Sequence, residues 1–83
     1  MHRPEYDRLR ELVAGARLAS GLSQRQVSRR LGMAPTYVSK VERGERLVNV
    51  LEFIELLLAV DADPRVVFGA LCDEIAPACH DEG

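Results

Sequence analysis

The segment from Ser23 to Gly44 constrains the fold more than any other part of the chain, because it allows only two very short helices. Ser23 and Gln26 form a capping-box pattern that starts the first helix, and Gly32 suits the left-handed residue that ends it. Pro35 suits the first position of the second helix, which Gly44 closes. Two helices of about two turns each, joined by so short a link, cross at a steep angle and share one core.

Glycine, proline and capping residues divide the rest of the 83-residue chain into three further helices. These signals are Gly21, Asn49 with Glu52, and Asp63 with Pro64. We predict helices over residues 4–19, 23–31, 35–43, 50–60 and 64–75. The predicted fold class is all-α, a compact five-helix bundle in one domain, residues 1–76. Residues 77–83 are predicted to be a short disordered tail, because Pro77 stops the last helix.

Apolar spacing indicates which sides of the two central helices face inward. We expect five residues to share one core, namely Val27, Leu31, Met33, Val38 and Val41. Ser28 is small at the point where the two helices approach most closely. A helical wheel of the second helix adds Ala34 to the inward side and leaves a polar face opposite. That polar face consists of Thr36, Ser39, Lys40 and Arg43.

Charge is segregated along the chain, although its formal net value is only −2. Residues 17–46 hold seven basic and two acidic side chains, a balance of +5, so the remainder carries −7. A basic centre between acidic ends presents one surface to phosphates while the rest is repelled from them. A solvated basic helix face accounts for these charges equally well, so charge alone does not decide between the two interpretations.

Other features argue against several classes of protein. The chain is too short for a separate catalytic module, and its two histidines, His2 and His80, fall in the predicted tails. We therefore expect no enzyme, no bound metal and no cofactor. The longest apolar run, residues 56–60, is too short to span a membrane, and no signal peptide is evident. We expect a cytoplasmic protein in which Cys72 and Cys79 are free thiols.

The stretch LSQRQVSRRLGMAPTYVSKVERGER, followed by an Asn-capped apolar helix, resembles the lambda-repressor-like, or Cro-like (XRE), helix-turn-helix family. The resemblance covers about residues 6–75 and departs at Ser28, where the family usually has alanine. It implies a lambda-repressor-like five-helix domain that binds double-stranded operator DNA as a two-fold dimer. We therefore predict a sequence-specific transcriptional regulator, a repressor that reads a pseudo-palindromic operator through the major groove.

The polar face of the second central helix is the predicted reading surface. Lys40 can donate to guanine O6 and N7, Thr36 can place its methyl group against a thymine methyl, and Ser39 can donate or accept. This face has no Asn, Gln or forward-placed Arg to make a good bidentate pair with a base. We therefore expect weak direct readout, supplemented by the deformability of the DNA.

Four residues are predicted to contact the DNA backbone, namely Ser23, Gln24, Tyr37 and Arg43. Ser23 serves equally well as a plain helix cap, and Tyr37 as a side chain that covers the core. The family resemblance also implies an ion pair between Arg17 and Glu42. This pair would tie the helix over residues 4–19 to the end of the DNA-reading helix over residues 35–43.

The fourth helix is apolar nearly all round, since only Glu52 and Glu55 are polar within residues 50–60. It is either the central helix of the bundle or partly buried against a second subunit. We favour a homodimer because the resemblance implies one. The candidate dimer contacts are Leu56, Phe68, Leu71, Cys72 and Ile75.

Two alternative functions remain. An antitoxin-type module, whose main partner is a protein and which regulates its own operon, fits the same fold. A metal or redox sensor built on Cys72, Cys79 and His80 fits less well, because their spacing is not a recognised zinc pattern. In the regulator interpretation, release from the operator would call for a second protein modulator or for removal of the chain.

Overall fold

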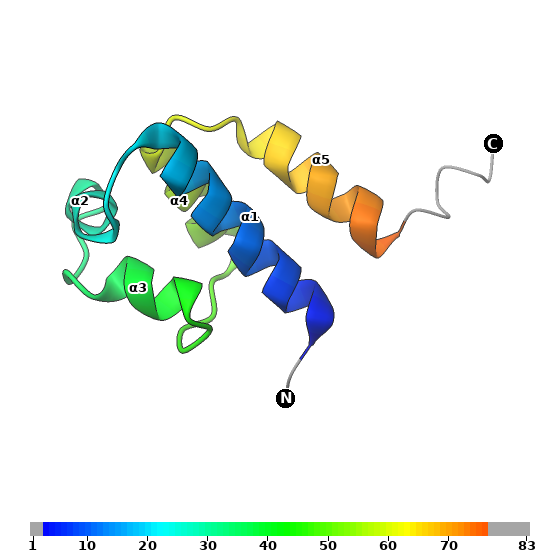
Figure 1. Ribbon diagram of the computed structural model, residues 1–83, viewed down its shortest axis with the longest axis horizontal. Helices are drawn as coiled ribbons and strands as arrows, with labels where there is room; N and C mark the ends of the chain where they lie inside the picture. Colours follow the sequence, from blue (N-terminus) through cyan, green and yellow to red (C-terminus); the bar gives the residue numbers. More distant parts are fainter. Residues whose placement is uncertain (1–2, 77–83) are drawn as a thin grey trace.

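The computed structural model describes residues 3–76 and contains five helices (Figure 1). They are α1 (Pro4–Ser20), α2 (Gln24–Arg30), α3 (Tyr37–Glu42), α4 (Val50–Ala59) and α5 (Pro64–Ile75). This described part of the chain has no strand, so the predicted all-α five-helix fold is confirmed. The predicted tail, residues 77–83, lies outside the described residues.

Local capping explains why the helices begin where they do. Ser23 at α2 and Asn49 at α4 each complete a capping box, in which the cap side chain accepts from the backbone N–H of the third helical residue. In return, the backbone N–H of the cap residue donates to the side chain of that third residue. Asp63 caps α5, where its carboxylate accepts from the Arg65 N–H. Gly32 ends the α2 turn with a φ of 68°, a conformation that glycine adopts without strain.

The sequence predicts that α3 starts at Pro35, but the helix begins two residues later, at Tyr37. Pro35 and Thr36 form a turn instead, in which the Tyr37 N–H donates to the Ala34 carbonyl at 2.9 Å. The first α-helical bond runs from the Lys40 N–H to the Thr36 carbonyl at 3.0 Å. Proline therefore starts the turn that leads into the helix rather than the helix itself.

The core lies where α1, α2, α3 and α4 meet. Val27, Val38 and Val41 are almost completely buried there, as their spacing predicts, and Leu31 packs against them partly buried. The expectation for Met33 and Ala34 is wrong, because both are exposed. The Met33 N–H donates to the Ser28 carbonyl at 2.9 Å and holds the link on the outside. Ala34 precedes the late start of α3, so a helical wheel does not apply to it.

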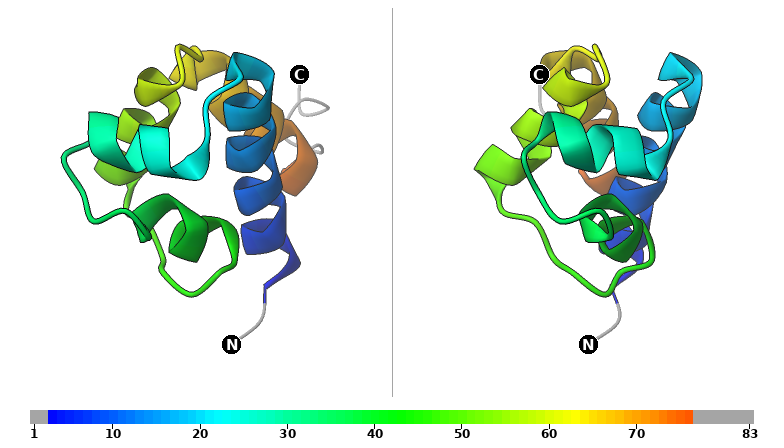
Figure 2. Two further views of the ribbon diagram at one scale, coloured as in Figure 1. Left: turned by 60° about the vertical axis from the view of Figure 1, so that its left-hand side comes forward. Right: turned by 90° about the vertical axis from the view of Figure 1, so that its left-hand side faces the viewer.

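The helices are arranged so that α2 and α3 lie together at one side of the molecule and α5 lies at the other (Figures 1 and 2). Arg8 of α1 pairs with Glu74 of α5, and the Val48 N–H donates to the Tyr6 hydroxyl oxygen at 2.8 Å. Helix α1 is therefore fixed to α5 and to the segment before α4. None of the described helices is both long and apolar enough to cross a membrane.

Candidate nucleic-acid interface

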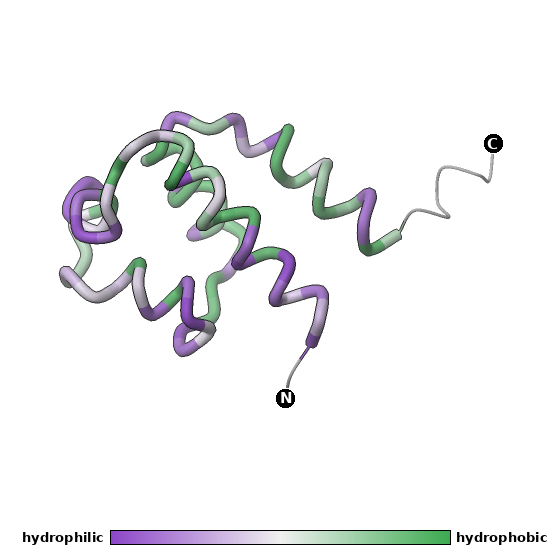
Figure 3. Tube along the Cα trace, in the orientation of Figure 1, coloured by the Kyte–Doolittle hydropathy of each residue, from purple (hydrophilic) through white to green (hydrophobic). Residues whose placement is uncertain are grey.

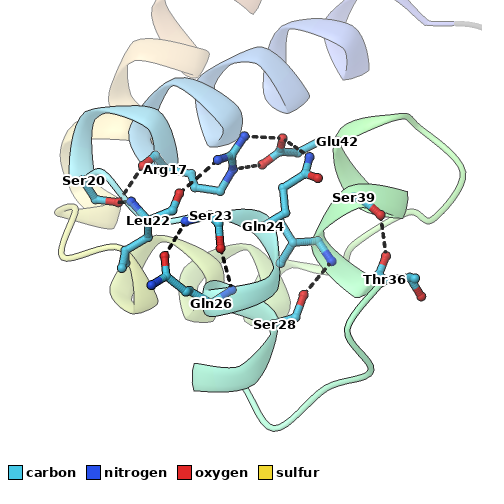
Figure 4. Close-up of polar contacts among 11 residues, drawn as sticks. Arg17, Ser20, Leu22, Ser23, Gln24, Gln26, Ser28, Thr36, Ser39 and Glu42 are labelled. Carbon is cyan, nitrogen blue, oxygen red and sulfur yellow. Dashed lines mark hydrogen bonds and ion pairs between the residues drawn. The ribbon is translucent and has the colours of Figure 1, made fainter.

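The exposed side of α3 carries a group of polar residues on a helix whose opposite side is anchored in the core. Thr36, Lys40 and Arg43 are exposed and Ser39 is partly exposed. The Ser39 hydroxyl donates to the Thr36 carbonyl at 3.0 Å, which holds it against the helix (Figure 4). Lys40 has no carboxylate within ion-pair distance among the described residues. The ammonium group of Lys40 is thus available to a ligand.

The N-terminus of α3 receives its cap from α2 rather than from its own sequence. Thr36, the residue before α3, makes no capping bond with its side chain. Instead, the Val38 N–H donates to the hydroxyl oxygen of Ser28 at 3.1 Å, and Ser28 is completely buried. Amide groups in the first turn of a helix have no partner within the helix, so this contact satisfies one of them. Ser28 therefore fixes α3 relative to α2.

A polar cluster on the other side of the site joins α1, α2 and α3 (Figure 4). The guanidinium of Arg17 donates from Nε to Glu42 Oε2 at 2.7 Å and from Nη2 to Oε1 at 3.0 Å. The two side chains are only 13% and 9% exposed. The hydrogen bonds to Glu42 raise the pKa of Arg17, against the opposing effect of burial. The structure thus places these two residues in a bidentate ion pair.

Gln24 joins the same cluster. Its amide nitrogen donates to Glu42 Oε1 at 2.8 Å, so the side chain is held against the end of α3. Ser23 is exposed, and its hydroxyl oxygen accepts from the Gln26 N–H at 3.1 Å. Ser23 and Gln24, two of the four residues predicted to contact the DNA backbone, are therefore already engaged in bonds that fix the start of α2.

Tyr37 is also predicted to contact the DNA backbone, but its side chain is 6% exposed and belongs to the core cluster. The Arg46 guanidinium lies over its ring, 5.1 Å from the centroid, and pairs with Glu52 at 2.7 Å. Burial, followed by the negative charge of Glu52, raises the pKa of the Tyr37 hydroxyl. This stack joins the turn after α3 to the start of α4.

Arg43, at the end of α3, is held by an acidic neighbour that sequence reasoning did not single out. Its guanidinium donates to both carboxylate oxygens of Glu45, at 2.9 and 3.2 Å, and both side chains are more than half exposed. The bond from Arg43, its charge and the charge of Lys40 lower the pKa of Glu45. A carboxylate therefore lies among the basic groups of the α3 face. The Arg-Gly-Glu spacing around a turn is the sequence signal for this contact.

A second unforeseen arginine supports the end of α3 from behind. Arg10 of α1 donates to the Glu42 carbonyl at 2.9 Å and pairs with Asp7. Gly44 has a φ of 80°, and a Cβ there would lie 3.2 Å from Arg10 Nε. The left-handed backbone conformation therefore favours glycine, and a Cβ would also displace the arginine side chain packed beside it by a few tenths of an ångström.

The proposed dimer contacts separate into two groups. Leu56 and Leu71 are 2% and 7% exposed, so they fill the interior of the single chain. Phe68, Cys72 and Ile75 lie on the exposed side of α5. Exposed apolar residues also continue along and before α4, where Figure 3 shows hydrophobic colouring. These additional residues are Leu47, Val50, Leu51, Ile54 and Leu58.

Between α4 and α5 lies a shallow apolar groove of about 210 Å³. It is lined by Val50, Phe53, Ile54, Pro64, Arg65 and Phe68. Phe53 and Phe68 meet edge to face in it, with ring centroids 6.3 Å apart. Val50, Ile54 and Phe68 are exposed and line this groove, so apolar surface is present on both α4 and α5.

The residues of the sensor alternative are only partly described. Cys72 is an exposed free thiol, whereas Cys79 and His80 lie outside the described residues. Within residues 3–76, no group of three or more His, Cys, Asp or Glu side chains is arranged to hold a metal ion.

Comparisons with known proteins point to one family. Residues 13–66, more than half of the chain, match a helix-turn-helix family. Among solved structures, the chain is similar to an XRE-family like protein from Pseudomonas syringae pv. tomato str. DC3000. The two chains are 34% identical, the match covers 81% of this chain and 82% of that one, and the TM-score is 0.78. No curated protein matches the sequence.

Proposed function

Since the chain belongs to the XRE family of helix-turn-helix proteins and is a DNA-binding transcription regulator, we propose that it is a sequence-specific repressor. It binds a pseudo-palindromic operator as a homodimer and places α3 in the major groove. The observation that carries this proposal is the polar side of α3, exposed on a helix that is fixed from behind by two neighbouring helices.

Direct readout is assigned to Thr36, Ser39 and Lys40. B-form DNA has a major groove about 12 Å wide, which admits one α-helix. Lys40 donates to guanine and the Thr36 methyl group meets a thymine methyl, whereas Ser39 tolerates either a donor or an acceptor. Only Lys40 carries a charge among the three, so we expect direct readout to be supplemented by the deformability of the DNA.

Backbone contacts are assigned to Ser23, Gln24 and Arg43. Gln24 keeps its second amide hydrogen for a phosphate while the first is bound by Glu42. Arg43 binds a phosphate in place of Glu45, so its ion pair with Glu45 breaks when DNA binds. Tyr37 is assigned to packing instead, because its ring is buried beneath Arg46.

The homodimer is proposed to use the apolar surface of α4 and α5, in particular Ile54 and Phe68. Both side chains are exposed and line the α4–α5 groove. Contiguous apolar surface of this kind usually marks an interaction site. A two-fold dimer presents two copies of α3 to half-sites about 34 Å apart, one turn of DNA. Bound in this way, in the cytoplasm, the protein represses by excluding polymerase from the operator.

The test of this proposal is selection from a random duplex library with the full chain, followed by sequencing of the retained DNA. We expect enrichment of an inverted repeat with half-sites one helical turn apart. Retention of DNA without any enriched sequence would contradict a sequence-specific repressor. Failure to retain duplex DNA at low salt would contradict the assignment of α3 to the major groove.

A further inference from the structure

Ion pairing divides the basic side chains of this protein into two groups. Of the eleven lysines and arginines, all within the described residues, eight lie within 4 Å of a carboxylate oxygen. Only Arg25, Arg29 and Lys40 have no such partner in the described part of the chain. Lys40 belongs to the reading face of α3, whereas the two arginines lie on α2 and have so far been given no role.

The two arginines share one side of α2 and are both exposed. They are four residues apart, so their side chains are neighbours on the helix surface, where like charges repel. Arg25 also lies in the first turn of α2, where the positive end of the helix dipole disfavours a cation. Within the described residues the charge of Arg25 has neither an ion-pair partner nor a favourable position in the helix dipole, so it is available to a partner.

The position of this side relative to α3 follows from the helical repeat. Ser28 marks the direction of α3, because its hydroxyl oxygen accepts from the Val38 N–H. At about 100° per residue, Arg25 and Arg29 lie roughly 60° and 100° round the helix from Ser28, on the side opposite to buried Val27. The arginines therefore flank the contact between α2 and α3 on its outer edge. Figure 2 shows α2 and α3 side by side at the same end of the molecule.

We infer that Arg25 and Arg29 bind phosphates of the DNA strand that borders the groove occupied by α3. This inference rests on the proposed function and extends the DNA contact along α2 beyond Gln24. In helix-turn-helix proteins the first helix crosses the DNA backbone while the second enters the groove, so an unpaired cation on that edge meets phosphate. These two contacts add affinity for every duplex and carry no sequence information.

The experiment measures the affinity of the full chain for a duplex of random sequence as a function of salt concentration. The variants are Arg25→Gln, Arg29→Gln and the double variant. Arg3→Gln is the matched control, because its side chain is 66% exposed and pairs with Glu5 at the start of α1, the end of that helix far from α2. Each lost phosphate contact reduces the slope of log affinity against log salt by about 0.9. We expect that change for each single variant, about twice that change for the double variant, and none for the control.

The selected operator supplies a second readout. Arg25→Gln and Arg29→Gln should weaken operator and random duplex by the same factor, because a phosphate contact does not distinguish sequences. Salt slopes of the variants equal to that of the unsubstituted chain would overturn the inference. The same result is expected if the two arginines bind an acidic protein instead of DNA. In that outcome operator selection by the unsubstituted chain remains intact, so the proposed function stands. If the unsubstituted chain binds no duplex, the proposed function fails together with the inference.

Discussion

Glu42, the last residue of the recognition helix, accepts two hydrogen bonds from Arg17 of α1, at 2.7 and 3.0 Å. Because Gln24 donates to the same carboxylate at 2.8 Å, a single side chain connects three helices. This connection sets the end of α3 against the start of α2. The geometry of the DNA-binding face thus depends on a charge pair that lies behind it.

Loss of either partner should strongly destabilise the fold. Removing one side of a buried ion pair costs up to about 3–5 kcal/mol, because the other charge is left without its partner. We expect Arg17→Ala and Glu42→Ala each to lower the free energy of unfolding toward that range, and the double variant to cost less than their sum. Urea denaturation followed by circular dichroism measures this. The control is Arg65→Ala at the exposed, weakly paired start of α5. Equal stability of Arg17→Ala and Arg65→Ala would show that the pair contributes nothing.

Replacing Ser28 by alanine should lower the free energy of unfolding. The substitution keeps the small size needed between α2 and α3 but leaves the Val38 N–H without its 3.1 Å partner. A buried donor without a partner costs about 1–3 kcal/mol. We expect Ser28→Ala to lower the unfolding free energy by about 1 kcal/mol, whereas Ser39→Ala, at a partly exposed site, has little effect. An unchanged denaturation midpoint for Ser28→Ala would contradict the inter-helix cap.

Glu45 should limit the affinity of the protein for DNA. Its carboxylate holds Arg43 and repels phosphates that approach the α3 face. Arg43 lowers the pKa of Glu45, so the carboxylate is ionised at neutral pH. Its negative charge therefore limits DNA affinity at neutral pH. We expect Glu45→Gln to bind random duplex several-fold more tightly, with a steeper salt dependence, in an anisotropy titration. Glu11→Gln on α1 removes the same charge elsewhere and serves as the control. Unchanged or weaker binding by Glu45→Gln would refute the competition.

The apolar surface of α4 and α5 should control the oligomeric state. Phe68 is 49% exposed and Ile54 36%, and a charge at either position disfavours burial against a second subunit. We expect Phe68→Asp and Ile54→Glu to shift the sedimentation coefficient from dimer to monomer. Leu18→Glu, at a 66% exposed site on α1, should leave the dimer intact. A dimer that persists in both groove variants would place the interface elsewhere.

The helices and their caps could be predicted from sequence because the signals are local. Ser23 with Gln26 and Asn49 with Glu52 occupy the two ends of a capping box within four residues. The error at Ala34 arose because a helical wheel was extended to a residue that precedes α3, and the error at Met33 because an apolar residue in the link between α2 and α3 was assigned to the core. A periodicity argument holds only inside the helix to which it is applied.

The polar framework of the site was less accessible. The ion pair of Arg17 and Glu42 was expected from the family resemblance, not from the spacing of the two residues. Arg10, which donates to a carbonyl 32 residues away, has no local signature, and neither does Ser28 as a cap for another helix. Contacts of this kind are set by tertiary packing, which a single sequence does not specify.

The central claim, that the exposed face of α3 reads the DNA sequence, is tested most directly by the ratio of operator affinity to random-duplex affinity. A good base contact discriminates by about 1–3 kcal/mol, which corresponds to about 5-fold to more than 100-fold in that ratio. We expect Lys40→Ala and Thr36→Ala to lower the ratio, the lysine variant more strongly, while Arg3→Ala, at an exposed site before α1, leaves it unchanged. If Lys40→Ala and Thr36→Ala weaken both duplexes equally and keep the ratio of the unsubstituted chain, α3 does not read the sequence and the account is contradicted.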